Sequence, residues 1–181
     1  MKAVLISIRV EHNVNIFYNH NKRWEGRKTL PSIVKVKNYI DPTTTYNKSD
    51  DDVKFYVYEP KSGGGCGKVI GEFICDFAQS FSRGIMKEIV EALVVSKEFA
   101  RSYFNKGKGY MIRINEPKRY DQPKELGEFS LFEKKDCDYF WCGICCERTQ
   151  NNVINCNNLT CEQKIIKRPP QSWCYVEEVE Q

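Results

Sequence analysis

The sequence predicts an α+β fold around a strongly curved sheet or a small barrel. Most apolar runs are short and rich in β-branched or aromatic residues, whereas only one long stretch repeats at helical spacing. The chain has 181 residues, 41% of them apolar, so a single domain over residues 1–181 can bury a core of its own.

Six segments have the composition of strands. The glycines between residues 53–59 and 68–77 predict that these two strands form an antiparallel hairpin. Pro117 is expected to end the strand that precedes it. The expected strands are residues 1–10, 33–39, 53–59, 68–77, 110–115 and 173–179.

The longest expected helix runs from Ile85 to Phe104. Its apolar residues recur at intervals of three and four, which predicts an amphipathic helix against the sheet. A short helix or turn is expected over residues 12–18, and a single helical turn within residues 123–129.

Charge is distributed unevenly along the chain. Residues 1–40 carry eight lysines and arginines against two glutamates, although the whole chain has a net charge of only +4. A basic N-terminal part is consistent with phosphate-bearing ligands, and equally with a solvated basic face.

Several classes of protein are excluded. No apolar run approaches the ~18 residues of a membrane span, and the opening apolar stretch is too short for a signal peptide, so a cytoplasmic location without membrane contact is expected. The run Gly63–Gly65 lacks the ending of a phosphate loop, and no Ser-His-Asp pattern is present.

Residues 22–31 form the most informative cluster. They combine four cations, one carboxylate and one indole, and in an extended segment Glu25 and Arg27 share a face. Lys22, Glu25 and Arg27 in one pocket can hold a phosphate or a carbonyl, with Arg27 at the surface of that pocket. The alternative is a surface loop with solvent-facing ion pairs.

This cluster resembles the signature of ASCH domains, a branch of the PUA-like superfamily. Lys22, Glu25 and Arg27 match the signature at its spacing, while His20 stands at its leading glycine and Val10 at the proline that follows the opening strand. Residues 67–73 resemble the family's central strand, and residues 120–126 and 168–178 resemble the subfamily that is common in bacteriophages and prophages.

The resemblance implies a small PUA-like β-barrel of the ASCH type with flanking helices, and a pocket beside the signature. Such domains generally bind RNA or modified nucleobases; some hydrolyse acetylated cytidine nucleosides and others are ribonucleases. The small amidohydrolases have threonine where this chain has Glu25, and many phage relatives have a Trp-His pair where this chain has Ile112 and Arg113. Both departures weaken the catalytic interpretation.

Six of the nine cysteines lie between Cys137 and Cys161, within an apparent insertion over residues 133–167. Two cysteine pairs separated by a loop suit a structural zinc ion, with unliganded thiols as the alternative. Cys66, Cys75 and Cys174 are expected to be small buried or half-buried thiols. The expected zinc ligands are Cys142, Cys145, Cys156 and Cys161, with Cys137 and Cys146 as alternates.

Three functions remain open. The first is binding of RNA or a nucleotide-like ligand, and the second is hydrolysis of a modified nucleoside or RNA with Lys22 and Glu25 in proton transfer. The third is a viral anti-defence protein that sequesters a nucleotide signal or binds a host defence protein. The expected ligand-binding residues are Ser7, Arg9, Lys22, Trp24, Glu25, Arg27, Lys28 and Arg113.

Overall fold

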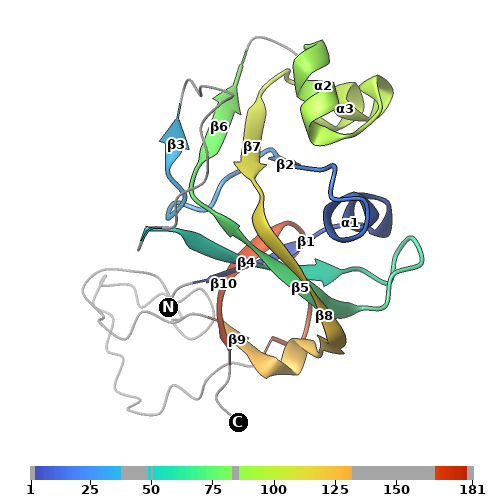
Figure 1. The fold of residues 1–181 in the computed structure, drawn as a ribbon, viewed down its shortest axis with the longest axis vertical. Coiled ribbons are helices and arrows are strands. Elements are labelled where there is room, and N and C mark those ends of the chain that lie inside the picture. The colour runs from blue at the N-terminus through green and yellow to red at the C-terminus, as the bar shows by residue number, and fades with distance from the viewer. Residues whose placement is uncertain (1–2, 38–48, 50, 83–85, 132–165, 179–181) are drawn as a thin grey trace, which may run out of the picture.

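The computed structural model describes residues 3–37, 49, 51–82, 86–131 and 166–178, which form two β-sheets and three α-helices (Figure 1). Sheet A has the strand order β8-β5-β4-β1-β10-β9, and sheet B has the order β2-β7-β6-β3. The strands are β1 (Ala3–Ser7), β2 (Trp24–Arg27), β3 (Val36–Lys37), β4 (Val53–Glu59), β5 (Lys68–Cys75), β6 (Ala78–Phe81), β7 (Gly109–Arg113), β8 (Asn115–Lys124), β9 (Phe129–Leu131) and β10 (Trp173–Glu178). The helices are α1 (Val10–Phe17), α2 (Lys87–Leu93) and α3 (Lys97–Tyr103), with a 3-10 turn at Leu126–Glu128.

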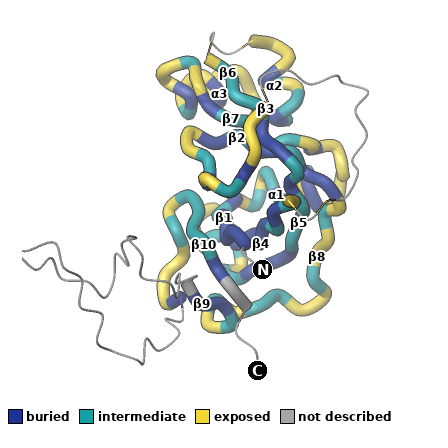
Figure 2. Tube along the Cα trace, turned by 90° about the vertical axis from the view of Figure 1, so that its left-hand side faces the viewer, coloured by how far each residue is buried: buried dark blue, intermediate teal, exposed yellow. Residues whose placement is uncertain are grey.

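The centre of sheet A is buried on both faces. Strand β1 pairs in parallel with β4 and antiparallel with β10, and its residues Ala3–Ile6 are all buried. A continuous apolar run is expected for a strand covered on both sides. Figure 2 shows the resulting buried region around β1 and β4. The predicted hairpin of β4 and β5 is confirmed as an antiparallel pair.

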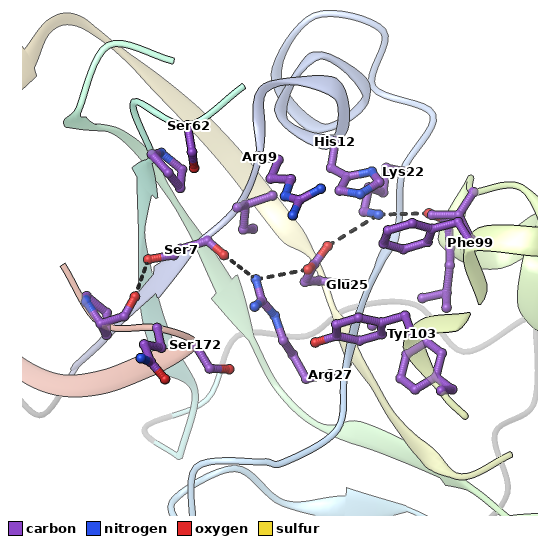
Figure 3. A pocket seen from close by; sticks show the side chains of 18 of the residues that line it. Ser7, Arg9, His12, Lys22, Glu25, Arg27, Ser62, Phe99, Tyr103 and Ser172 are labelled. Carbon is purple, nitrogen blue, oxygen red and sulfur yellow. Dashed lines mark hydrogen bonds and ion pairs between the residues drawn. The ribbon is translucent and has the colours of Figure 1, made fainter. Parts of the chain in front are cut away.

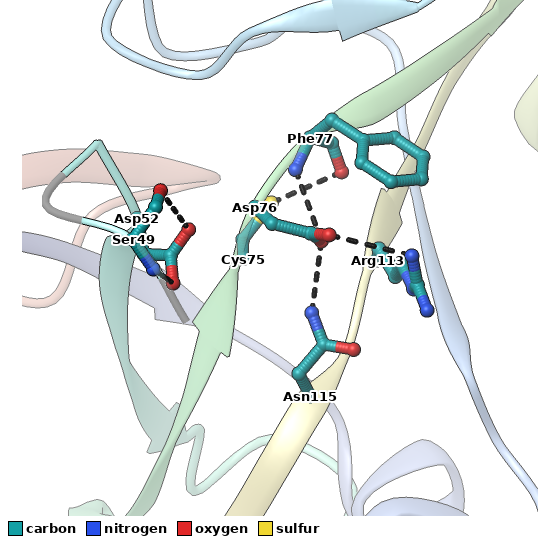
Figure 4. Close-up of polar contacts among 7 residues, drawn as sticks. All are labelled: Ser49, Asp52, Cys75, Asp76, Phe77, Arg113 and Asn115. Carbon is teal, nitrogen blue, oxygen red and sulfur yellow. Dashed lines mark hydrogen bonds and ion pairs between the residues drawn. The ribbon is translucent and has the colours of Figure 1, made fainter. Parts of the chain in front are cut away.

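The two sheets are joined by strands that continue from one into the other. β5 ends in sheet A and the chain enters sheet B as β6, while β7 ends in sheet B and the chain enters sheet A as β8. Asp76 lies at this corner (Figure 4). Its carboxylate accepts hydrogen bonds from the Asn115 side chain (2.8 Å) and the Phe77 amide (3.1 Å), and lies 3.3 Å from the Arg113 guanidinium. The carboxylate therefore connects both continuing strands.

Helix α1 packs closely against sheet A at Gly71. A Cβ atom at this position would lie 2.8 Å from the ring of Phe17 on α1 and 2.5 Å from the carbonyl oxygen of Lys118. Glycine at Gly71 thus allows α1 to approach β5.

The single long helix predicted over Ile85–Phe104 is wrong. The structure has α2 and α3 instead, because Val94 adopts a left-handed conformation with φ of 51°. Ser96 then caps α3 by accepting a hydrogen bond from the Phe99 amide at 3.1 Å. A β-branched residue rarely adopts this conformation, so tertiary packing and not local propensity accounts for the break.

Three other expectations need correction. The described residues form two open sheets, and no closed barrel is found among them, because β5 and β7 continue into the second sheet. Pro117 does not end a strand; it lies within β8, an edge strand, where proline is tolerated. Cys66 is exposed, whereas Cys75 is buried and Cys174 is half-buried as expected.

The insertion over residues 133–167 lies almost wholly outside the described residues.

No helix in the described part of the chain has the length and apolar character needed to cross a membrane.

Candidate functional site

A cavity of about 470 Å³ lies beside β2, the edge strand of sheet B. Its walls come from the end of β1, the first turn of α1, helix α3 and residues 169–172 (Figure 3). Segments that are far apart in the sequence therefore meet here, and the volume is in the range of small-molecule sites.

Lys22, Glu25 and Arg27, called the charged triad below, lie along one wall of the cavity. The Lys22 Nζ lies 3.3 Å from Glu25 Oε2, and an Arg27 terminal nitrogen lies 3.0 Å from Glu25 Oε1. The same Arg27 nitrogen donates to the Ser7 carbonyl at 2.6 Å. The predicted shared face of Glu25 and Arg27 is thus confirmed, but Arg27 is only 7% exposed and is not the surface residue expected.

The carboxylate of Glu25 is ionised in this environment. Its burial acts to raise the pKa, but the charges of Lys22 and Arg27 act in the opposite direction and outweigh it, so its pKa lies below the ordinary value. The charged triad carries two cations and one anion, and therefore keeps a net positive charge next to the cavity.

The break between α2 and α3 supplies a partner for Lys22. Because α2 ends at Leu93, the carbonyl of Leu93 accepts a hydrogen bond from the Lys22 Nζ at 2.7 Å. A cation at the C-terminus of a helix is stabilised by the unpaired carbonyls there. The helix break that the sequence pattern did not predict is thus part of the site.

Two departures from the ASCH signature have simple structural correlates. His20 has a φ of 50°, a backbone conformation that glycine adopts without strain. Val10 is the first residue of α1, a position that proline often occupies. Both residues keep the backbone that the signature residues would favour.

Two aromatic side chains lie next to the charged triad in the cavity wall (Figure 3). Phe99 and Tyr103, one turn apart on α3, stack with their ring centroids 5.7 Å apart and an interplanar angle of 7°. A cavity whose wall combines cations with flat aromatic rings suits a planar group that carries negative charge.

The structure brings five of the predicted site residues together at the cavity and places three elsewhere. Trp24 packs against Phe77 with ring centroids 5.9 Å apart, and Arg113 lies over the same ring and pairs with Asp76. The Lys28 Nζ lies outside the cavity lining, 4.9 Å from the centroid of the Tyr103 ring. The residues at the cavity are Ser7, Arg9, Lys22, Glu25 and Arg27.

Sequence reasoning missed several lining residues. His12 is not among the expected site residues, and Phe99 belongs to the helix predicted over Ile85–Phe104, yet both line the cavity. Gln171 and Ser172 lie in a block that resembles the ASCH subfamily, which is the one signal that pointed to them. The position of His12 next to α3 depends on tertiary packing and has no local signature.

The expected zinc ligands Cys142, Cys145, Cys156 and Cys161 lie outside the described residues. Among the residues that are described, no group of three or more potential ligands could hold a metal ion. The zinc site stays a prediction.

No protein-family profile and no curated protein matches the sequence. In structure, the chain is similar to ASCH from Zymomonas mobilis at 16% identity, covering 68% of this chain and 73% of that protein with a TM-score of 0.47. A tyrosine-to-phenylalanine mutant of that protein matches at 15% identity, covering 70% of this chain and 77% of the mutant chain, with a TM-score of 0.47. A serine-to-alanine mutant matches at 16% identity, covering 67% of this chain and 70% of the mutant chain, with a TM-score of 0.43.

Proposed function

We propose that the cavity binds an anionic nucleotide-like ligand, either free or as part of RNA, and that the chain is an ASCH-type protein of the phage-associated kind. The observation that carries this proposal is the charged triad, whose side chains are each less than 10% exposed yet line an open cavity. Buried charges are costly unless they are well paired, and an anion would complete the pairing of the two cations.

The roles of the individual groups follow from their contacts. Lys22 and Arg27 would bind the anionic group, since each keeps N–H groups beyond those used by Glu25 and the carbonyls of Leu93 and Ser7. Among these, the Arg27 Nε is buried without a hydrogen-bond partner. Phe99 and Tyr103 would stack against a base, and Glu25 would orient both cations.

Calorimetry with the four nucleoside 5′-monophosphates and a ten-nucleotide oligouridylate tests this proposal by measuring binding. Lys22→Gln and Arg27→Gln remove the charges, while Lys87→Gln is the matched control because Lys87 is 83% exposed and outside the cavity. Each cavity variant should weaken binding by roughly ten- to a hundred-fold, the effect of one charge-assisted contact. If neither variant changes binding, the charged triad is a structural feature.

Salt distinguishes the two forms of the ligand. Oligouridylate binding should weaken steeply with salt if several phosphates are neutralised, because each contact releases counterions. A mononucleotide held within the cavity should show a shallow dependence.

A hydrolase is the second candidate, favoured by the 3.3 Å contact between Lys22 and Glu25 within a cavity that also contains His12. Turnover of acetylated cytidine or RNA above a boiled control, abolished in Lys22→Gln but kept in Lys87→Gln, would establish it. Absence of turnover leaves binding as the function.

A further inference from the structure

His12 is a titratable side chain in the cavity wall that the proposed function does not use. It lies in the first turn of α1, beside the charged triad (Figure 3), and its ring centroid is 5.3 Å from that of Phe99. The His12 Nε2 is buried and has no hydrogen-bond partner. A buried ring nitrogen without a partner is unusual, and its presence at a cavity indicates an interaction that is completed by something else.

The charges around His12 are of both signs. Lys22 and Arg27 disfavour a proton on the imidazole, whereas Glu25 and Glu11 favour it. Arg9, which also lines the cavity, is paired loosely with Glu11 at 3.9 Å. Burial and the charge of Lys22 dominate, so the pKa of His12 lies below its ordinary value and the ring is neutral at neutral pH.

We propose that binding of an anion in this cavity is coupled to uptake of one proton by His12, which turns the imidazole into a ligand-binding cation. The inference rests on the proposed function. Burial and the charge of Lys22, with a smaller effect of Arg27, hold the pKa of His12 down, and an anion beside Lys22 and Arg27 offsets the part that is due to charge. The proton comes from the solvent, and the Nε2–H group then donates toward the anion or Glu25.

The coupling must be reciprocal. If the anion increases the affinity of His12 for a proton, then protonation of His12 increases the affinity for the anion by the same factor. Anion binding should therefore become tighter as the pH falls from 8 toward 5, by roughly tenfold if the pKa of His12 rises by about one unit on binding.

The experiment uses an anion that does not itself titrate in this range. The dinucleoside phosphate UpU and inorganic sulfate both keep a constant charge between pH 5 and pH 8, unlike a phosphate monoester. Calorimetry of the unmodified protein in buffers of different ionisation enthalpy at pH 7 counts the protons taken up. Dissociation constants are measured across the same pH range for the protein and for His12→Gln, which keeps a neutral hydrogen-bonding side chain.

The second histidine provides the matched control. The chain contains only two histidines, and His20 is exposed and outside the cavity. His20→Asn, a residue that tolerates the left-handed backbone there, should keep the full pH dependence. His12→Gln should lose it and bind with no net proton uptake.

The possible outcomes separate the two proposals. Proton uptake with tighter binding at low pH, lost in His12→Gln alone, supports the coupling. Binding that is independent of pH and takes up no proton overturns the coupling and leaves the proposed function intact. If neither UpU nor sulfate binds at any pH, the coupling fails, whereas the proposed function fails only if the nucleoside monophosphates and oligouridylate also do not bind. If His12→Gln does not fold, proton counting on the unmodified protein and on His20→Asn still decides the question.

Discussion

Two buried regions of this protein are built from opposite kinds of residue. Around β1, β4 and β5 the interior is apolar, with Phe55 and Phe73 stacked 5.0 Å apart and fully buried. At β2 the interior contains the charged triad, with Lys22 and Glu25 only 3% and 5% exposed. The first region is explained by the hydrophobic effect alone, because burial of apolar area stabilises the fold.

The second region needs another explanation. Desolvation of each ion costs several kcal/mol, and attraction between the ions recovers this only with good geometry and further hydrogen bonds. The triad makes such bonds across the molecule, from Arg27 to Ser7 on β1 and from Lys22 to Leu93 on α2. Well-packed apolar residues would often serve stability as well. The comparison therefore supports the proposal that these charges are present for a ligand.

The largest expected effects come from truncating one residue in each region. Glu25→Ala would leave two cations buried without their counter-charge and should lower the free energy of unfolding by about 3–5 kcal/mol. Phe73→Ala should cost a similar ~3–5 kcal/mol through the cavity it leaves. Urea unfolding followed by tryptophan fluorescence measures both, and a loss below ~1 kcal/mol for Glu25→Ala would show that the triad is not effectively buried.

The next effect concerns the face of β2 that contacts the helices. A Cβ atom on Gly26 would lie 2.9 Å from the Phe104 ring and 3.0 Å from a Leu93 methyl group. Gly26→Ala should destabilise the protein by about 1–3 kcal/mol, since overpacking shifts both side chains. It should also weaken ligand binding, because α2 presents the Leu93 carbonyl to Lys22. Unchanged thermal stability would contradict the close packing.

The two regions should also respond differently to acid. The pKa of Glu25 is lower in the folded protein than its ordinary value of 4.5, so its ionised form contributes stability above that pH. This contribution is lost as the pH falls below 4.5 through the folded-state pKa. The stability of Glu25→Gln should therefore fall less steeply with acid than that of the unmodified protein, while Phe73→Ala should keep the unmodified slope. Parallel curves for all three proteins would argue against an ionised Glu25.

The smallest effect on the described fold is expected from removal of metal. If Cys142, Cys145, Cys156 and Cys161 bind zinc, protein purified without added zinc should contain about one equivalent by elemental analysis. Chelation should leave the urea unfolding of the two sheets nearly unchanged, since the described apolar core contains none of these four cysteines. Absence of zinc with readily titrated thiols would reject the site.

The sequence predicted the parts of the molecule that local patterns determine. The hairpin of β4 and β5 follows from two β-branched runs around glycines, and the shared face of Glu25 and Arg27 follows from strand alternation. The strands β6, β8 and β9 lack such a pattern and were missed, and β2 was considered only as an extended segment. The left-handed Val94, which ends α2 and frees the Leu93 carbonyl, is imposed by packing and not by propensity.

The cavity itself could be predicted only in part. Lys22, Glu25 and Arg27 lie within six residues, so their grouping was visible in the sequence. His12 and Phe99 are 87 positions apart and meet only because α1 and α3 approach one another, as their ring contact shows. Arg113 seemed a suitable anion-binding residue by its charge, but the corner at Asp76 uses it instead.

The measurement that tests the central claim most directly is a replacement of the whole charged triad by apolar residues. The variant Lys22→Met, Glu25→Leu, Arg27→Met removes all three charges while keeping similar volumes. If the triad is present for a ligand, this variant should unfold at an equal or higher urea concentration and bind nucleotides and UpU at least a hundred-fold more weakly, the loss expected for two charge-assisted contacts. A variant that is destabilised by more than ~3 kcal/mol, in a protein whose unmodified form binds no anion, would show instead that the triad serves only to hold the two sheets together.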